Sequence, residues 1–129
     1  MLIAVDAAGG EYAPQEIVKG AVKAAQEFQV DIALVGRRAI LHVLANHHPK
    51  KPGFTIIEAS QIIEPHEPPI KAIRSKPNSS IVVGTNLVKD GTASAFVSAG
   101  STGAIVYAAL LTLGKIKGIE RPALGSLLD

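Results

Sequence analysis

The stretch AFVSAGSTGAIVYAALLTL, residues 95–113, decides the fold because it joins an apolar strand to an apolar helix through a break of small residues. The break, Ser98 to Gly103, contains only serine, alanine, glycine and threonine. A tight turn between a buried strand and a helix is the repeating unit of parallel α/β sheets. The question that the break raises is whether it is only a turn or also a site that holds an anion.

The rest of the chain repeats this alternation of strand and helix. Short apolar runs predict strands at 1–5, 30–35, 54–58 and 93–97, and helical spacing of apolar residues predicts helices at 14–28, 37–48, 70–75, 78–90 and 101–113. We therefore expect an α/β fold with a largely parallel sheet covered on both faces. The last helix is apolar almost all round, so we expect it to be buried on more than one side. Residues 123–128 are a candidate fifth strand.

Composition limits the classes of function. The chain has 129 residues, 47% of them hydrophobic, which suits a single domain with a sizeable core. It has no cysteine, which excludes disulfides and thiolate chemistry. Thirteen Lys and Arg against eleven Asp and Glu give a net charge of +2, too mild to indicate nucleic-acid binding. The longest uncharged apolar run, 104–113, is far shorter than the ~20 residues of a membrane span.

The loop SAGSTGA, residues 98–104, is the first candidate site. Ligands of open parallel sheets bind beyond the carboxyl ends of the strands, where this loop is expected. Gly100 and Gly103 permit close backbone approach, and Ser101 or Thr102 is expected at the N-cap of the helix that follows. The positive end of that helix favours phosphate or carboxylate. The loop matches neither the Walker nor the GxGxxG motif, and an ordinary serine-capped turn would have the same composition.

Two further stretches carry candidate residues. In DAAGGEYAP, residues 6–14, Asp6 ends the first strand, and Gly9 and Gly10 would admit a ligand to the backbone; the alternative is an Asp that stabilises a turn. In KAIRSKPNSS, residues 71–80, three cations precede a pair of serines, and Arg and Lys are the usual partners of phosphate. The alternative there is the solvated face of a short helix.

Four stretches resemble, in order, the bacterial phosphate acyltransferase family (PlsX). They are IAVDAAGGEYAP (3–14), EPHEPPIKAIRSKPNSSIVVG (64–84), SAGSTGA (98–104) and GKIKGIERPAL (114–124). The resemblance implies a three-layer α/β/α fold similar to that of phosphotransacetylases and isocitrate dehydrogenases. It also implies an enzyme of phospholipid synthesis that transfers a fatty acyl group from acyl carrier protein to inorganic phosphate, with no metal or organic cofactor. The family is usually homodimeric and acts in the cytoplasm, as a peripheral protein at the inner face of the membrane.

The resemblance also implies roles for particular residues. Those expected in catalysis are Ser101, Thr102, Arg74 and Lys76. Those expected to bind phosphate or substrate are Asp6, Gly9, Gly10, Ser79, Ser98, Gly100 and Gly103. Lys71 and Arg121 are weaker candidates for attracting an acidic acyl carrier protein. Two other functions stay open: a phosphotransacetylase-like transferase that uses acyl-CoA, and a module that binds phosphate or a partner without catalysis.

The chain departs from the family pattern in four respects. Ala8 stands where the family usually has Met, Glu11 where it has Asp, and Ser101 where it has Asn. Family members are also considerably longer, so we expect residues 1–129 to form the N-terminal portion of the fold. On that expectation, a chain that ended at Asp129 would lack much of the cleft and of the dimer surface.

Overall fold

The structure, a computed structural model, describes residues 1–48 and 53–128. Its elements in chain order are β1 (Leu2–Asp6), α1 (Gln15–Phe28), β2 (Asp31–Gly36), α2 (Arg38–Asn46), β3 (Thr55–Glu58), α3 (Pro69–Ser75), α4 (Ser80–Lys89), β4 (Ala95–Val97) and α5 (Thr102–Thr112). The strands form one sheet in the order β3-β2-β1-β4, and every pair of neighbours is parallel. The predicted α/β fold is confirmed.

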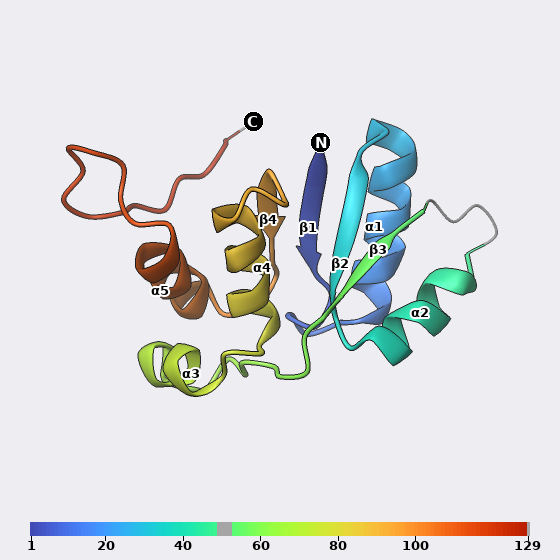
Figure 1. The fold of residues 1–129 in the computed structure, drawn as a ribbon, viewed down its shortest axis with the longest axis horizontal. Coiled ribbons are helices and arrows are strands. Elements are labelled where there is room, and N and C mark those ends of the chain that lie inside the picture. Colours follow the sequence, from blue (N-terminus) through green and yellow to red (C-terminus); the bar gives the residue numbers. More distant parts are fainter. Residues whose placement is uncertain (49–52, 129) are drawn as a thin grey trace.

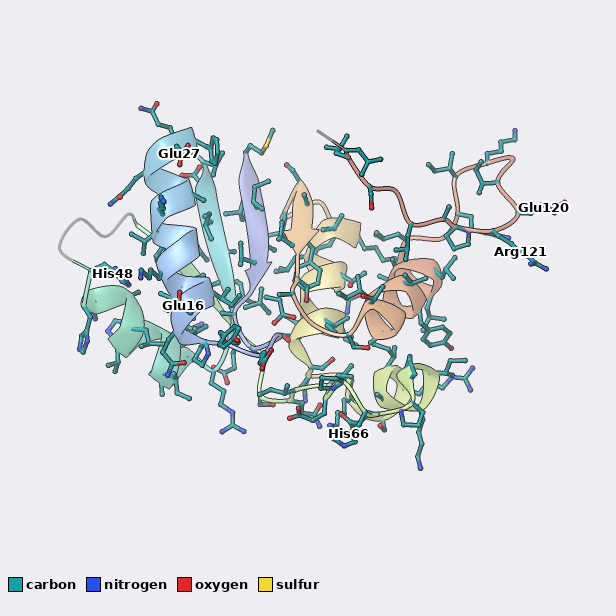
Figure 2. All side chains as sticks on the ribbon, turned by 180° about the vertical axis from the view of Figure 1, so that it is seen from behind. Glu16, Glu27, His48, His66, Glu120 and Arg121 are labelled. Carbon is teal, nitrogen blue, oxygen red and sulfur yellow. The ribbon has the colours of Figure 1, made fainter. Side chains whose placement is uncertain are left out.

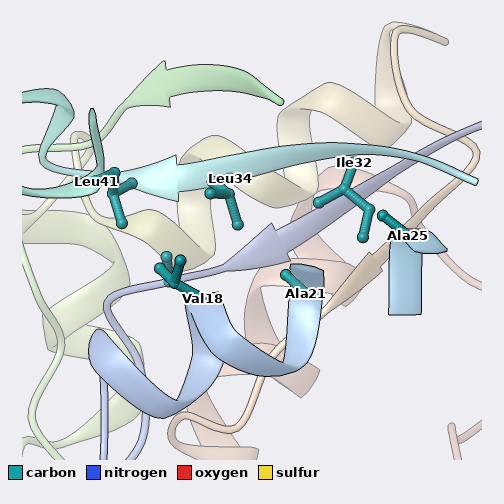
Figure 3. Packing of buried hydrophobic residues seen from close by; sticks show 7 residues of the cluster. Val18, Ala21, Ala25, Ile32, Leu34 and Leu41 are labelled. Atoms are coloured by element: carbon teal, nitrogen blue, oxygen red, sulfur yellow. The ribbon is translucent and has the colours of Figure 1, made fainter. Parts of the chain in front are cut away.

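The sheet is covered on both faces because its side chains alternate. In β2, Ile32 and Leu34 point toward α1, where they pack against Val18 and Ala21 (Figure 3). Val35 lies on the other face, in a cluster to which α4 also contributes. Helices α1 and α2 thus lie on one side of the sheet and α4 on the other, in three layers (Figure 1).

Helix α5 departs from expectation. It packs mainly against α3 and α4, outside the layer that touches the sheet (Figure 1). Only Ala104 and Ala108 of this helix are fully buried, and Leu111 is 62% exposed. The expectation that α5 is buried on more than one side was therefore wrong, because among the described residues its two neighbours cover one side only.

The predicted fifth strand was also wrong. Residues 123–128 have no strand pairing and are exposed throughout. Apolar composition alone does not make a strand, which also needs a neighbouring strand to take its backbone hydrogen bonds. The segment after α5 instead loops over that helix (Figure 1). Within the described part of the chain, no helix is both long and apolar enough to cross a membrane.

Candidate functional site

Two loops meet where β1 and β4 end. The strands are parallel neighbours, so their carboxyl ends lie at one edge of the sheet, and Asp6 is brought to Ser98 across 92 residues of sequence. The Ser98 hydroxyl donates a hydrogen bond of 2.7 Å to Asp6 Oδ2. The Asp6 side chain is almost fully buried, at 1% exposure. This bond ties the two predicted loops together.

Further hydrogen bonds from Asp6 and Ser98 hold the backbone of each loop in place. Asp6 Oδ1 accepts from the backbone N–H groups of Ala8, at 3.0 Å, and Gly9, at 2.8 Å. The Gly100 N–H donates to Ser98 Oγ at 3.0 Å, so the serine hydroxyl both donates and accepts. Asp6 thus fixes the first loop directly and the second through Ser98. It is a turn-stabilising residue, the alternative that its sequence position left open.

The glycines of the first loop are required by this close packing. A Cβ on Gly9 would collide with the Asp6 carboxylate and lie 3.1 Å from the Gly100 Cα. Gly10 has a φ of +107°, a backbone conformation that favours glycine, and lies against Ala99. The two loops therefore approach each other backbone to backbone, and larger residues would separate them.

The second loop leads into the start of α5. Ser101 is the N-cap residue, and its hydroxyl accepts from the Ala104 N–H at 3.3 Å. The N–H groups of Thr102 and Gly103 have no partner inside the helix, because the first turn of any helix lacks preceding carbonyls. The helix dipole adds partial positive charge at the same point. The start of α5 therefore has the geometry on which the sequence-based expectation of an anion site rests, and the site itself stays a prediction.

A cavity of about 520 Å³ opens beside the loops. It is lined by residues 8–11 and 13 of the first loop, 99–101 of the second, and 62–65 of the segment between β3 and α3. No candidate site residue was expected from the sequence in this third wall. Its signal was its place after the third strand, which brings it to the same edge of the sheet.

Lys76 braces this third wall. Its Nζ donates to the Ile62 backbone oxygen at 2.8 Å and forms an ion pair of 2.8 Å with Glu67. The hydrogen bond from Lys76, assisted by that from the Glu64 N–H, lowers the pKa of Glu67 below its usual 4.5. Lys76 therefore lies beside the wall of the cavity and does not line it.

The other predicted residues lie in different places. Ser79 is fully buried and caps α4, where its hydroxyl accepts from the Val82 N–H at 3.3 Å. Arg74 lines a separate hollow on α3, together with Lys71. A Cβ on Gly103 would lie 2.9 Å from Pro69, so this glycine permits the contact between α3 and α5.

The structure therefore brings part of the predicted site together. Gly9, Gly10, Gly100 and Ser101 line one cavity, with Asp6 and Ser98 joining the loops that carry them. The other residues predicted for the site do not line it: Arg74, Lys76, Ser79, Thr102 and Gly103. Among the described residues, no three His, Cys, Asp or Glu side chains are grouped as metal ligands would be.

Comparison with known proteins identifies the family. A family model described as "Fatty acid synthesis protein" matches residues 1–128. A phosphate acyltransferase of Dehalococcoides mccartyi is 52% identical over 128 residues, which cover 99% of this chain and 37% of the relative. The phosphate acyltransferase of Synechocystis is 51% identical over 126 residues, or 97% of this chain and 36% of the relative. The chain thus spans little more than a third of the length of these relatives. It belongs to the fatty acid synthesis protein family, the PlsX phosphate acyltransferases that its motifs resemble.

Proposed function

We propose that the full-length protein transfers a fatty acyl group from acyl carrier protein to inorganic phosphate, and so supplies acyl phosphate for phospholipid synthesis. The observation that carries the proposal is the hydrogen bond between Asp6 and Ser98, which holds the two glycine-containing loops together beside the start of α5. The names of the relatives support acyl transfer to phosphate. The carrier protein, the homodimer and the location in the cytoplasm at the membrane face are proposed from the resemblance.

The reaction places definite demands on the site. A phosphate oxygen attacks the thioester carbonyl carbon, a C–O bond forms, the C–S bond breaks, and the thiolate leaves and takes up a proton. Phosphate is itself the nucleophile, so the protein needs no cysteine or activated serine. It must hold two reactants together and stabilise the negative charge that develops on the carbonyl oxygen.

The chain offers groups for both demands. We assign phosphate or the oxyanion to the backbone at Gly100–Gly103, with the hydroxyls of Ser101 and Thr102 beside it. Gly9 and Gly10 form the facing wall, which lies so close that a Cβ added at Gly9 would be 3.1 Å from the Gly100 Cα. Asp6 and Ser98 act as positioning residues through the hydrogen bonds between the loops.

The cationic candidates take two different roles in this proposal. Lys76 is a positioning residue, because its contacts with Ile62 and Glu67 hold the third wall of the cavity. Arg74 is exposed on α3 and does not line the cavity between the loops. In this proposal it contacts a bound anion only from outside that cavity. Ser79, being fully buried, acts through the capping of α4.

The test uses the full-length protein with phosphate and each of three donors: a long-chain acyl carrier protein, a long-chain acyl-CoA and acetyl-CoA. Phosphate-dependent thioester cleavage with the acyl carrier protein is the expected result. Cleavage of acetyl-CoA instead would establish the phosphotransacetylase-like alternative. A folded protein that cleaves none of the three would show a module without catalysis.

Ser101 gives a sharper prediction at the loop itself. Its hydroxyl caps α5, and asparagine is an equally good N-cap residue. Ser101→Asn should therefore leave the free energy of unfolding unchanged, whereas Ser101→Ala should lower it by about 1 kcal/mol. Urea unfolding measures both variants. If alanine is as stable as serine, the hydroxyl does not stabilise the helix, and its place in the loop needs another reason.

A further inference from the structure

The third wall of the cavity, residues 62–65, is fixed at its start by Gln61. The Gln61 N–H donates to the Asn78 backbone oxygen at 3.1 Å, and the Gln61 carbonyl accepts from the Ser80 N–H at 3.3 Å. The side-chain Oε1 of Gln61 accepts from the Asn78 N–H at 3.0 Å. Gln61 and Ser79 thus form a single parallel bridge beside the start of α4. Three groups of one residue therefore fix the place where the wall begins.

The end of this wall is held by Lys76 and Glu67. Besides the Ile62 backbone oxygen, Lys76 Nζ contacts the Glu67 carboxylate at 2.8 Å. Glu67 Oε2 accepts from the Glu64 N–H at 2.6 Å, and the Glu67 N–H donates to the Glu64 backbone oxygen at 3.1 Å, which closes the turn. Between the two ends, Ile63 is buried among apolar side chains of α3, α4 and α5. The wall is therefore held at both ends and in its middle, although it has no strand or helix of its own.

Both ends of the wall are held by residues 76–80, which join α3 to α4. These residues belong to the stretch KAIRSKPNSS, for which the sequence predicted contact with phosphate. Their polar groups bond other parts of the protein: Lys76 holds the wall, Ser79 caps α4, and the Ser80 N–H bonds Gln61. Both serines are buried. In the described structure these groups therefore hold the wall and the start of α4.

We propose that Gln61 is a positioning residue for phosphate, and that residues 76–80 act with it as a clamp that fixes the width of the cavity. The inference rests on the proposed function, because it takes phosphate as the ligand of this cavity. Gln61 and Lys76 do not line the cavity, so they act only through the wall. A displacement of about 1 Å in a site can cost about a hundredfold in rate, so an irregular segment that faces the phosphate loop needs such a clamp.

Replacement of Gln61 tests the clamp in the full-length protein. Gln61→Met keeps the length of the side chain, removes the acceptor, and should raise the KM for phosphate at least about threefold in the thioester assay. Gln61→Glu keeps an oxygen acceptor and should keep the KM of the unaltered protein. A variant that is only less stable would contain fewer folded molecules, which lowers the measured kcat and leaves KM unchanged. A rise in KM that the conservative variant restores is therefore specific to positioning.

The matched control is Gln29→Met, the same substitution at an exposed residue just after α1. Figure 2 shows Glu27, at that end of α1, far from His66, which follows the wall. The control should leave the KM for phosphate unchanged. Should Gln61→Met fail to fold, Lys76→Met removes the other hold and should raise the same KM. Equal KM values in Gln61→Met and Gln29→Met, or a rise in Gln61→Glu as large as in Gln61→Met, would overturn the proposal.

Hydrogen exchange and calorimetry test the clamp without turnover. Gln61→Met should speed exchange of the amides at 62–67 and leave β2 unchanged, and it should weaken the binding of inorganic phosphate. If these changes occur in a full-length protein that cleaves no thioester, the proposed function fails and the clamp stands. Unchanged exchange at 62–67 would overturn the clamp whatever the turnover. Faster exchange with unchanged phosphate affinity would show that the wall is held for another reason, and would equally reject the proposal.

Discussion

Replacing Ser98 by alanine is expected to lower the free energy of unfolding by about 2 kcal/mol. The hydroxyl donates to the Asp6 carboxylate at 2.7 Å and accepts from the Gly100 N–H at 3.0 Å. A hydrogen bond to a charged group contributes about 1.5–3 kcal/mol, and a neutral one about 0.5–1.5 kcal/mol. Together the two bonds would contribute about 2–4.5 kcal/mol. We expect the lower end of this range, because Ser98 is only half-buried and water replaces part of the lost hydrogen bonding.

Urea unfolding of matched variants measures this loss. Ser94→Ala is the control, because Ser94 lies exposed just before β4 and its hydroxyl has no partner among the described residues, so the change should cost less than about 0.5 kcal/mol. Ser98→Thr keeps a hydroxyl and should recover part of the stability. A double-mutant cycle with Asp6→Asn should give a coupling energy of about 1 kcal/mol or more between the two side chains. A coupling of zero, or equal stability of the two alanine variants, would refute the claim that this bond joins the loops.

Two further predictions concern the same site. Gly9→Ala should destabilise the protein by about 1–3 kcal/mol, because the new Cβ would collide with Asp6. Gly20→Ala in α1, where the space around the glycine is open, should instead stabilise it by about 0.5–1 kcal/mol. Urea unfolding of both variants measures the two changes in the free energy of unfolding. The pKa of Glu67 should lie below 4.5 and return toward it in Lys76→Met, as carboxyl NMR titration would show. Because the folded-state pKa is lowered, the contribution of this pair to stability is present above pH 4.5 and is lost as the pH falls through the lowered value. An unchanged Glu67 titration in Lys76→Met would exclude the ion pair as the cause.

The sequence predicted the sheet well because its strands and helices have strong local signals. Apolar runs and helical spacing located every strand and helix of the described structure to within a few residues. It failed at α5 and at residues 123–128, where the outcome depends on which surfaces lie nearby and not on the local residues. A helix that is apolar on all sides is expected to pack against several neighbouring elements, but its own sequence does not show which elements lie next to it.

The candidate site was predictable only in part. The glycines and serines of the two loops were found because they follow predicted strands and precede predicted helices, where ligands of parallel sheets bind. The hydrogen bond between Asp6 and Ser98 depends on β1 and β4 being neighbours in the sheet. The order of strands in a sheet cannot be predicted from the local sequence pattern. Lys76 looked like a free cation for the same reason, because its partner Glu67 lies in a segment whose path was unknown.

The 92-residue separation between Asp6 and Ser98 makes the site one of the last parts of the domain that can form. Contacts between distant segments require closure of a long loop, which costs chain entropy before any contact is gained. Strand β4 is only three residues long and, among the described residues, pairs with β1 alone, so its detachment from β1 would separate the two loops while β1, β2 and β3 stay paired. A ligand held between the loops would close that opening, and slower hydrogen exchange in β4 would then report occupancy of the site without any measurement of turnover.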